Sequence, residues 1–456
     1  MNSFLLSRQA GIISPHALAL AQSNRLLQAL QTAPNVHFAL TRRETSAVDG
    51  PSSRGALGLA SVAHAAGVNS IAIDRFEGRY LLSGGADSSV ALWDLESENT
   101  TSDGPGTYLP YGSAARTSTT ESLGITHISF YPFDSLAFLT SGYDGTVKIS
   151  SSETLKASAT FDIGSTVYSH ATSAVATHLL VACASQHPAI RLVDLRTGSG
   201  THSLAGHSGS VLTVAWHPKD ENTLASGGSD GTCRLWDIRR SASSLGVLDM
   251  EDSIGIAGYD GKGAGARRRE RGRAHNGAVN GVVWTDDGQY LVSTGQDERM
   301  RVWDMTTGAN TLANFGPALK NNHTTVLAPL IAPSHLSPVG SELLYYPNPT
   351  EILSFDMHSG SLQKRLRVAE LQKAQTADSG VRNLTNRTTS LAWRAHRIEM
   401  YSSHADGTIR CWQPRTWEDD AADQEDGALD SEEDVVERKR KRDEFDQVVG
   451  HLANKR

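Results

Sequence analysis

A triplet of residues recurs at fixed spacing along this chain and constrains its fold more than any other feature. In each copy an Asp stands four positions after a Ser, and a Trp stands six positions after the Asp. The four copies are Ser83–Asp87–Trp93, Ser226–Asp230–Trp236, Ser293–Asp297–Trp303 and Ser402–Asp406–Trp412. A fifth copy has Thr140 and Asp144, with Ser150 in the Trp position. Such a repeat predicts units that bury their faces only by stacking against each other.

Each copy has the pattern of two strands joined by a tight turn. In the second copy, residues 224–226 and 232–236 alternate in polarity, as expected for strands with successive side chains on opposite faces. The intervening Ser229–Asp230–Gly231 is typical of a hairpin turn, because Gly231 tolerates a positive φ. The repeat therefore predicts antiparallel sheet.

A histidine precedes three of the copies, at His64, His207 and His275. With the triplets, these residues resemble the structural tetrad of WD-repeat proteins, in which Trp, hydroxyl, imidazole and carboxylate are hydrogen-bonded in series. A buried carboxylate without such partners costs several kcal/mol. We therefore expect these histidines and aspartates to be structural rather than catalytic.

Two weaker units fill the gaps in the repeat. Val181–Asp194 places Cys183, His187 and Val193 at the tetrad positions, and Leu343–Met357 places Phe355 at the Trp position. The Trp-position markers are then residues 93, 150, 193, 236, 303, 355 and 412. They predict an all-β fold, a seven-bladed WD-repeat β-propeller. We expect Gly58–Ala63 to supply the outer strand of the last blade, which would close the ring and remove an exposed sheet edge.

The remaining sequence divides into segments outside the ring. Residues 1–40 predict a helix-loop-helix arm, with a helix over Ala17–Leu30 that Pro15 opens. The alternatives are a terminal helix folded onto its own propeller and a frayed tail. We expect a linker at 41–57, the propeller at 58–416 with a loop insertion at 251–273, and a charged tail at 417–456.

The insertion and the tail are strongly charged. The insertion ends in five arginines between residues 267 and 273, which is typical of a solvated loop or of a surface for nucleic acid or an acidic partner. The tail has ten acids in the seventeen residues 418–434, so its composition predicts disorder. A basic pentamer follows, which is either a nuclear localisation signal or a solvated charge run: Arg438, Lys439, Arg440, Lys441 and Arg442.

Composition and motif searches argue against several classes of function. The net charge of −8 argues against general affinity for nucleic acid. No secretory signal and no apolar run of about 18–20 residues is visible. The three cysteines, Cys183, Cys233 and Cys411, lie too far apart for a disulfide framework or a zinc site, which favours a reducing compartment. We find no catalytic constellation, so we expect no enzyme activity, metal, cofactor or small-molecule substrate.

Several segments, some of them outside the repeat, are more specific than the tetrads. They are Phe4–Leu5 with Arg8–Gly11, then residues 77–85, 166–170, 274–277 with 279–281, and 308–312. In these segments the chain resembles the Cockayne syndrome WD-repeat protein A family, from its first residue to about residue 415.

The resemblance implies a function. Members of that family are substrate receptors of cullin-4 RING ubiquitin ligases, and they act at stalled RNA polymerase II in transcription-coupled nucleotide excision repair. The implied partners are the damaged-DNA-binding protein 1 adaptor, cullin-4 and its RING subunit, the Cockayne syndrome B ATPase and RNA polymerase II, with a nuclear location. The alternative is a general nuclear WD-repeat scaffold for chromatin or ribosome assembly, because a fold does not fix a function.

The same resemblance implies an adaptor-binding site. Cullin-4 receptors often carry Trp-Asp-x-Arg at the end of a blade strand, as in Trp236–Arg239, where Asp237 starts the turn and Arg239 reaches the rim. The preceding blade has the motif without Trp, at Asp194 and Arg196. Three residues of the arm are expected to occupy the adaptor groove as apolar and charged anchors: Phe4, Leu5 and Arg8.

Overall fold

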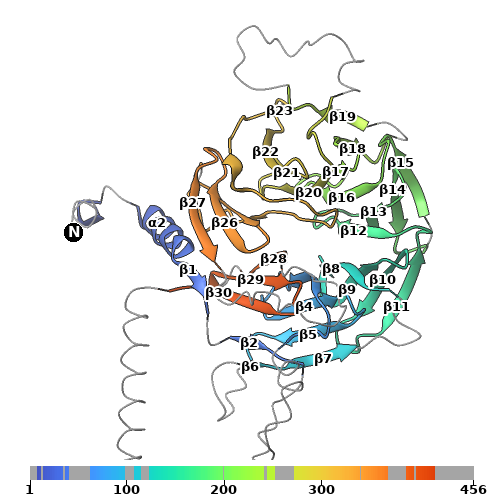
Figure 1. The fold of residues 1–456 in the computed structure, drawn as a ribbon, viewed down its shortest axis with the longest axis horizontal. Helices are drawn as coiled ribbons and strands as arrows, with labels where there is room; N and C mark the ends of the chain where they lie inside the picture. The colour runs from blue at the N-terminus through green and yellow to red at the C-terminus, as the bar shows by residue number, and fades with distance from the viewer. Residues whose placement is uncertain are drawn as a thin grey trace, which may run out of the picture.

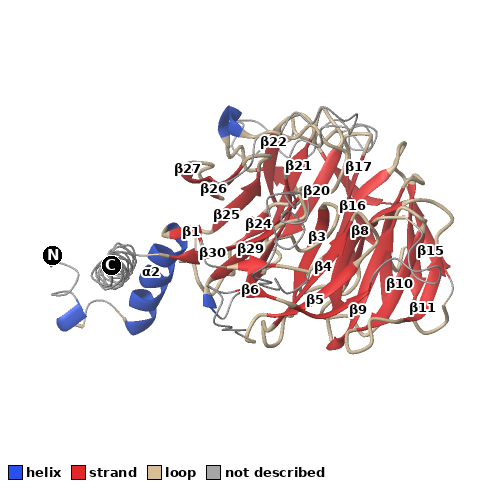
Figure 2. Cartoon of the chain, turned by 60° about the horizontal axis from the view of Figure 1, so that its bottom comes forward, coloured by secondary structure: helices blue, strands red, loops and turns tan. Residues whose placement is uncertain are grey.

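Seven four-stranded antiparallel sheets form the blades of a closed propeller in the computed structural model (Figure 1). The structure describes residues 8–11, 14–33, 36–40, 62–97, 107–114, 123–198, 200–240, 244–251, 272–338, 340–367, 387–394 and 397–415. The blades stand around a central channel, and helix α2 (Pro15–Gln28) projects from the ring (Figure 2). The predicted seven-bladed fold is confirmed.

The first four blades each run outward from the channel in chain order. Blade 1 has β3 (Val68–Ile73), β4 (Tyr80–Gly85), β5 (Val90–Asp94) and β7 (Pro110–Ala114). Blade 2 has β8 (Ile125–Tyr131), β9 (Asp134–Gly142), β10 (Thr146–Ser151) and β11 (Ala157–Asp162). Blade 3 has β12 (Val167–Thr172), β13 (Leu180–Ser185), β14 (Ala189–Asp194) and β15 (Gly200–Ala205). Blade 4 has β16 (Val211–Trp216), β17 (Thr223–Gly228), β18 (Cys233–Asp237) and β19 (Ser244–Leu248).

The last three blades depart more from the repeat. Blade 5 has β20 (Val279–Trp284), β21 (Tyr290–Gly295), β22 (Arg299–Asp304) and a short β23 (Ala309–Asn310), and the 3-10 helix η1 (Gly316–Ala318) follows it. Blade 6 has β24 (Leu330–Ile331), β25 (Leu343–Pro347), β26 (Glu351–Asp356) and β27 (Leu362–Arg367). Blade 7 has β28 (Thr388–Arg394), β29 (Glu399–His404), β30 (Ile409–Pro414) and, outermost, β1 (Leu30–Thr32). A small parallel pair joins β2 (His37–Phe38) to β6 (Thr107–Tyr108).

The N-terminal segment closes the ring, but not through the strand that the sequence predicted. Strand β1 pairs with β30, with Leu30 opposite Pro414, so the outer strand of blade 7 is Leu30–Thr32 and the prediction of Gly58–Ala63 was wrong. Of the predicted strand only Val62 and Ala63 are described, and the Ala63 N–H donates to Gly407 O at 2.9 Å in a hairpin of blade 7. The physical reason is burial: Leu30 is fully buried in an apolar cluster that includes Trp412.

Side chains of the innermost strands join neighbouring blades around the channel. The amide of Asn69 donates to Ile125 O at 2.6 Å, the hydroxyl of Thr126 donates to Val167 O at 2.6 Å, and the hydroxyl of Thr389 donates to Val68 O at 2.6 Å. The last of these bonds links blade 7 to blade 1. These three blade junctions are therefore held by polar side-chain bonds as well as by apolar packing.

Strand direction defines the two faces of the disc. In blade 7, β1 begins opposite the end of β30, and the end of β28 lies at this same side, where Arg394 pairs with Glu399. We call this side the arm face. The third strands of blades 3 and 4 also end on it, at Asp194 and Asp237, whereas the innermost strands begin on the opposite face.

Candidate functional site: the arm and the rim of the arm face

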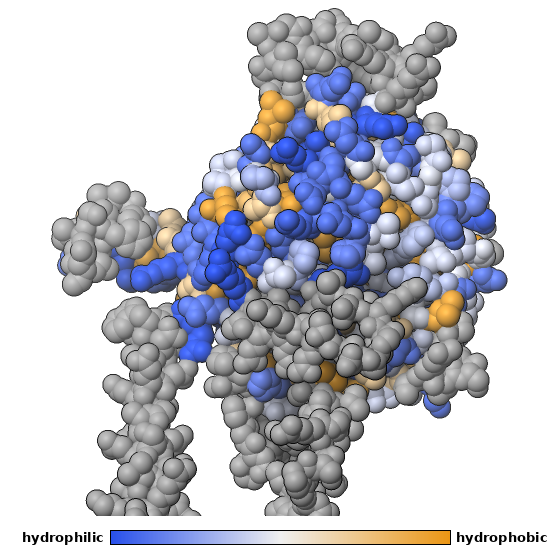
Figure 3. Space-filling view, in the orientation of Figure 1, coloured by the Kyte–Doolittle hydropathy of each residue, from blue (hydrophilic) through white to orange (hydrophobic). Residues whose placement is uncertain are grey.

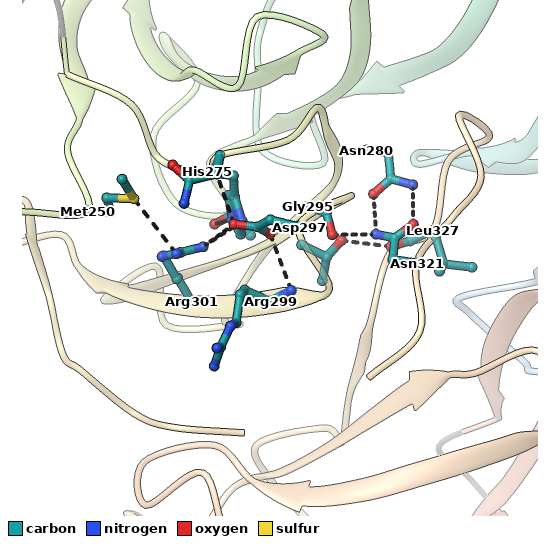
Figure 4. A network of polar contacts seen from close by, with 12 residues as sticks. Met250, His275, Asn280, Gly295, Asp297, Arg299, Arg301, Asn321 and Leu327 are labelled. Atoms are coloured by element: carbon teal, nitrogen blue, oxygen red, sulfur yellow. Dashed lines mark hydrogen bonds and ion pairs between the residues drawn. The ribbon is translucent and has the colours of Figure 1, made fainter. Parts of the chain in front are cut away.

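Three blades each contain a predicted tetrad, and the members of each tetrad are hydrogen-bonded in series within that blade. In blade 5, Trp303 Nε1–H donates to the Ser293 hydroxyl at 2.9 Å, and that hydroxyl lies 2.8 Å from His275 Nε2. His275 Nδ1 lies 2.8 Å from the Asp297 carboxylate (Figure 4). Because the serine hydroxyl accepts a hydrogen bond from the indole N–H, its own O–H donates to Nε2, so Nδ1 is the protonated nitrogen that donates to Asp297.

Blade 4 repeats this arrangement and blade 1 modifies it. His207 Nε2 lies 2.8 Å from the hydroxyl of Ser226, which accepts from Trp236, and His207 Nδ1 lies 3.2 Å from the Asp230 carboxylate. In blade 1, Trp93 and His64 bond Ser83 in the same way, at 2.9 and 2.7 Å. There the His64 Nδ1 atom lies 3.8 Å from Asp87, and the hydroxyl of Ser89 bridges the two.

In blade 7 the predicted triplet is only partly a tetrad. Trp412 Nε1–H donates to Ser402 at 2.9 Å, as predicted. The imidazole beside Ser402 belongs to His404, on the same face of β29 two residues later, at 3.0 Å. Asp406 is exposed and accepts from the N–H and hydroxyl of Thr408 at 2.9 and 2.6 Å. The prediction of Asp406 as a tetrad member was wrong, because it lies in the exposed hairpin turn.

Electrostatics in blade 5 stabilise the ionised carboxylate. Burial alone would raise the pKa of Asp297, but hydrogen bonds from His275 and the Asn276 N–H, together with the charge of Arg301, lower it to about 2. Arg301 lies 3.1 Å from Asp297. Burial also lowers the pKa of His275. The tetrad is thus a neutral imidazole beside an ionised carboxylate, which contributes to stability rather than transferring protons.

The arm contains the predicted helix, with an end two residues earlier than expected. Helix α2 begins with Pro15 in the first turn, and the hydroxyl of Ser14 caps it by accepting from Ala17 N–H at 3.1 Å. Leu27 is its one buried residue among those described, so the other faces of the helix are open to a second protein. The alternative of a helix folded flat onto the propeller does not hold (Figure 1).

The root of the arm is fastened to blades 6 and 7. Lys364 Nζ on β27 donates to the carbonyls of Gln28 and Leu30 at 2.8 and 2.9 Å, which caps the end of the helix. The Tyr345 hydroxyl donates to Leu27 O at 3.3 Å. Reasoning from the sequence missed Lys364 and Tyr345, because they lie over 300 positions from the arm and belong to the unit with the weakest repeat signal.

Only part of the predicted arm anchor is described. Arg8 is exposed in a short helical turn, in which Gly11 N–H donates to Arg8 O at 3.0 Å. Phe4 and Leu5 lie outside the described residues, and so does the basic pentamer 438–442. Most of the insertion at 251–273 and the tail 417–456 also lie outside them.

The Trp-Asp-x-Arg motif forms a rigid turn on the arm face. Arg239 makes two parallel bonds to the Asp237 carboxylate, from Nε at 3.0 Å and from a terminal nitrogen at 2.9 Å. Asp237 is 8% exposed, whereas the Arg239 side chain is 68% exposed. The hydrogen bonds and charge of Arg239 lower the pKa of Asp237. Asp237 therefore positions Arg239, and a partner would contact the arginine rather than the aspartate.

Neighbouring blades carry variants of the same turn. In blade 3 the Asp194 carboxylate accepts from Arg196 N–H at 2.9 Å, and Arg196 is exposed. In blade 1 the corresponding Asp94 pairs with Arg79, at 2.6 Å, from the adjoining hairpin. Arg79 presents a partly exposed guanidinium on the arm face that the sequence pattern did not single out.

The structure places Asp194, Arg196, Asp237 and Arg239 on the same face as the root of the arm, but it does not bring them next to the arm. The arm leaves the ring between blades 6 and 7, whereas Arg196 and Arg239 belong to blades 3 and 4, across the channel (Figure 1). A partner touching both would have to cover much of the arm face.

The described residues offer little for other chemistry. No group of three or more His, Cys, Asp or Glu side chains among them is arranged to hold a metal ion. None of the helices in the described ranges is long and apolar enough to cross a membrane. The described surface visible in Figure 3 is mainly hydrophilic, with hydrophobic residues in small scattered groups.

Comparisons with known proteins agree with this architecture. The WD40 family, described as WD domain, G-beta repeat, matches residues 59–94, 115–149, 198–237 and 269–304. WD repeat-containing protein ATCSA-1 of Arabidopsis thaliana is 28% identical over 430 residues, which cover 81% of this chain and 90% of that protein.

Two further relatives match shorter regions. Ribosome biogenesis protein ytm1 of Aspergillus fumigatus is 28% identical over 52% of each chain. DDB1- and CUL4-associated factor 13 of Dictyostelium discoideum is 30% identical over 23% of this chain and 18% of that protein. The chain is a seven-bladed WD-repeat propeller protein, and over most of its length it is similar to a plant homologue of the Cockayne syndrome A family.

Proposed function

We propose that this chain is the substrate receptor of a cullin-4 ubiquitin ligase, and that it binds the damaged-DNA-binding protein 1 adaptor through its arm face. The observation that carries the proposal is the helix α2, which is anchored at its last turn and buries only Leu27 among its residues. Similarity to ATCSA-1 over most of the chain supports the same role. A receptor needs no bond chemistry, because it raises the effective concentration of the target near the ligase.

The finer part of the proposal concerns the pathway. We propose that the targets are proteins at stalled RNA polymerase II in transcription-coupled nucleotide excision repair, that the Cockayne syndrome B ATPase is a partner, and that the protein works in the nucleus. Support comes from the likeness to ATCSA-1. The basic pentamer at 438–442 is the proposed localisation signal.

The anchored arm suggests how the adaptor is held. Because the Lys364 and Tyr345 bonds fix the last turn of α2, the helix direction is set before binding, which lowers the entropy lost on association. We propose that the apolar start of the arm and Arg8 enter a groove of the adaptor. Arg239 and Arg196, on the far side of the same face, would form separate charged contacts at the rim.

A charge-reversal experiment tests this arrangement. Arg8→Glu and Arg239→Glu should each weaken binding of the purified adaptor by about tenfold, the value of one charge-assisted contact. Arg299→Glu is the matched control, because Arg299 is equally exposed but begins β22 on the opposite face. Equal adaptor affinity for all three variants would remove the site assignment.

The rival function is a scaffold for ribosome assembly, which the partial similarity to ytm1 favours. The two differ in the proteins that accompany the native chain. Affinity purification from nuclei should recover the adaptor together with cullin-4 and its RING subunit. Recovery of preribosomal proteins with no adaptor would favour the scaffold.

A further inference from the structure

A cavity of about 410 Å³ opens where the innermost strands of blades 1, 2, 3 and 7 begin. Its lining comes from the first residues of β3, β8, β12 and β28, from the segment 324–329, from Arg387 just before β28 and from Tyr143 in the turn after β9. These strand ends lie on the face opposite the arm. The cavity is therefore separate from the proposed adaptor contact and remains accessible when the arm face is covered.

Three polar side chains of this cavity are already hydrogen-bonded within the protein. Asn69, Thr126 and Thr389 all donate to backbone carbonyls of neighbouring blades, at 2.6 Å each. They shape the wall and hold the blades together. They are not the groups that a ligand would use first.

Four other groups that line the cavity do not donate to backbone carbonyls of the described residues. Among the described residues, no hydrogen bond or ion pair engages the Arg387 guanidinium or the phenol hydroxyls of Tyr143 and Tyr168. His127 touches His170 through Nδ1 at 3.4 Å, and its Nε2 atom has no described partner. These groups share the cavity wall.

The lining of the cavity carries a positive charge and no negative one. Burial lowers the pKa of His127 to about 4, so this imidazole is neutral near pH 7. Of the residues that line the cavity, Arg387 is then the only charged one, and none is an Asp or Glu. Arg387 is half-buried, and its own backbone is fixed by a 2.9 Å bond from Ala405 N–H to Arg387 O.

A half-buried guanidinium loses hydration and ordinarily regains the energy from a carboxylate or phosphate. Tyr143 lies close enough for its phenol to interact electrostatically with Arg387, and Tyr168 is near Tyr143. An arginine with two phenols is a set of hydrogen-bond donors suited to an oxyanion, because the guanidinium and each phenol hydroxyl can donate a hydrogen bond to the same acceptor.

We propose that this cavity is an anion-binding site that receives a carboxylate or phosphate group of a protein segment bound across the face opposite the arm. Arg387 supplies the charge, and Tyr143 and Tyr168 supply neutral donors. The occupant is a partner or ligase target bearing an acidic or phosphorylated side chain. The site stands independently of the proposed ligase function, because it rests on the lining of the cavity alone.

Arginine modification tests the site without knowledge of the natural ligand. Phenylglyoxal reacts with accessible arginines, and peptide mapping by mass spectrometry gives the rate at each one. The full-length protein is treated in chloride, phosphate or glutarate at equal ionic strength. At an anion concentration of about twice the dissociation constant, mass action predicts that Arg387 reacts about threefold more slowly. Exposed Arg299, measured in the same samples, should react at the same rate in all three salts.

The two anions separate the possible sources. Protection by phosphate alone indicates a phosphorylated partner, and protection by glutarate indicates an acidic one. Tyr143→Phe should reduce the protection while leaving the rate in chloride unchanged, because it removes a donor and keeps the ring. Equal rates at Arg387 in all three salts, or equal protection of Arg387 and Arg299, would overturn the proposal.

Discussion

Replacing Asp297 by Asn tests whether the tetrads hold the blades through a charged hydrogen bond. The substitution keeps the size of the side chain but removes its charge, so His275 and Arg301 lose a carboxylate partner at 2.8 and 3.1 Å. The matched control is Asp406→Asn in blade 7, where the exposed aspartate accepts local bonds from the N–H and the hydroxyl of Thr408.

The magnitude follows from the pKa of the carboxylate. The pKa of Asp297 falls from an ordinary 3.8 to about 2. At about 1.4 kcal/mol per pKa unit, the folded state gains about 2–3 kcal/mol from the ionised form. Little discount for solvent is needed, because the side chain is 9% exposed. We expect Asp297→Asn to lower the free energy of unfolding by about that amount, and Asp406→Asn by less than about 0.5 kcal/mol.

The pH dependence of this loss is part of the prediction. Because the folded pKa lies below the unfolded one, the contribution of Asp297 is complete above about pH 4 and disappears as the pH falls through 2. Urea unfolding, followed by the fluorescence of the eight tryptophans, measures the difference at each pH. A difference that is equal for both variants at pH 7, or that persists unchanged at pH 2, would refute the reasoning.

Three further predictions follow from the packing. Trp236→Ala should destabilise the protein by about 3–5 kcal/mol in urea unfolding, because a fully buried indole and its bond to Ser226 are lost. Lys364→Met should speed hydrogen exchange in the last turn of α2 while leaving the urea midpoint within error, because it removes only the two bonds to the arm root. The three cysteines are buried, and burial raises the pKa of Cys183 and Cys233 to about 12, so a thiol reagent at pH 8 should label none of them before unfolding and all three after it.

The repeat predicted the blades well because its residues have the same structural role in each copy. Ser293, His275 and Trp303 were predicted from the repeat and its resemblance to the WD-repeat tetrad, and the structure bonds them in series. The same logic failed at Asp406, since the pattern cannot distinguish a carboxylate that turns inward to a histidine from one that stays in an exposed hairpin. His404 was missed because it follows its serine instead of preceding it.

The local sequence pattern could not predict the strand that closes the ring or the contacts at the root of the arm. Strand β1 has three residues, too few for an alternation signal, and its partner β30 lies almost the whole chain away. Lys364 and Tyr345 serve the arm only through tertiary contact. The rim motif was predicted correctly as a turn, with Arg239 outward, because Asp237 fixes it locally.

The central claim is that the adaptor is held through the exposed arm. Its most direct test is the dissociation constant of the purified adaptor for the full chain and for a chain without residues 1–26, which keeps Leu27 and Leu30 in their apolar cluster. The account predicts at least about a hundredfold weaker binding of the shortened chain, a loss of about 2.7 kcal/mol, with an unchanged unfolding midpoint. Equal affinity of the two chains would contradict it.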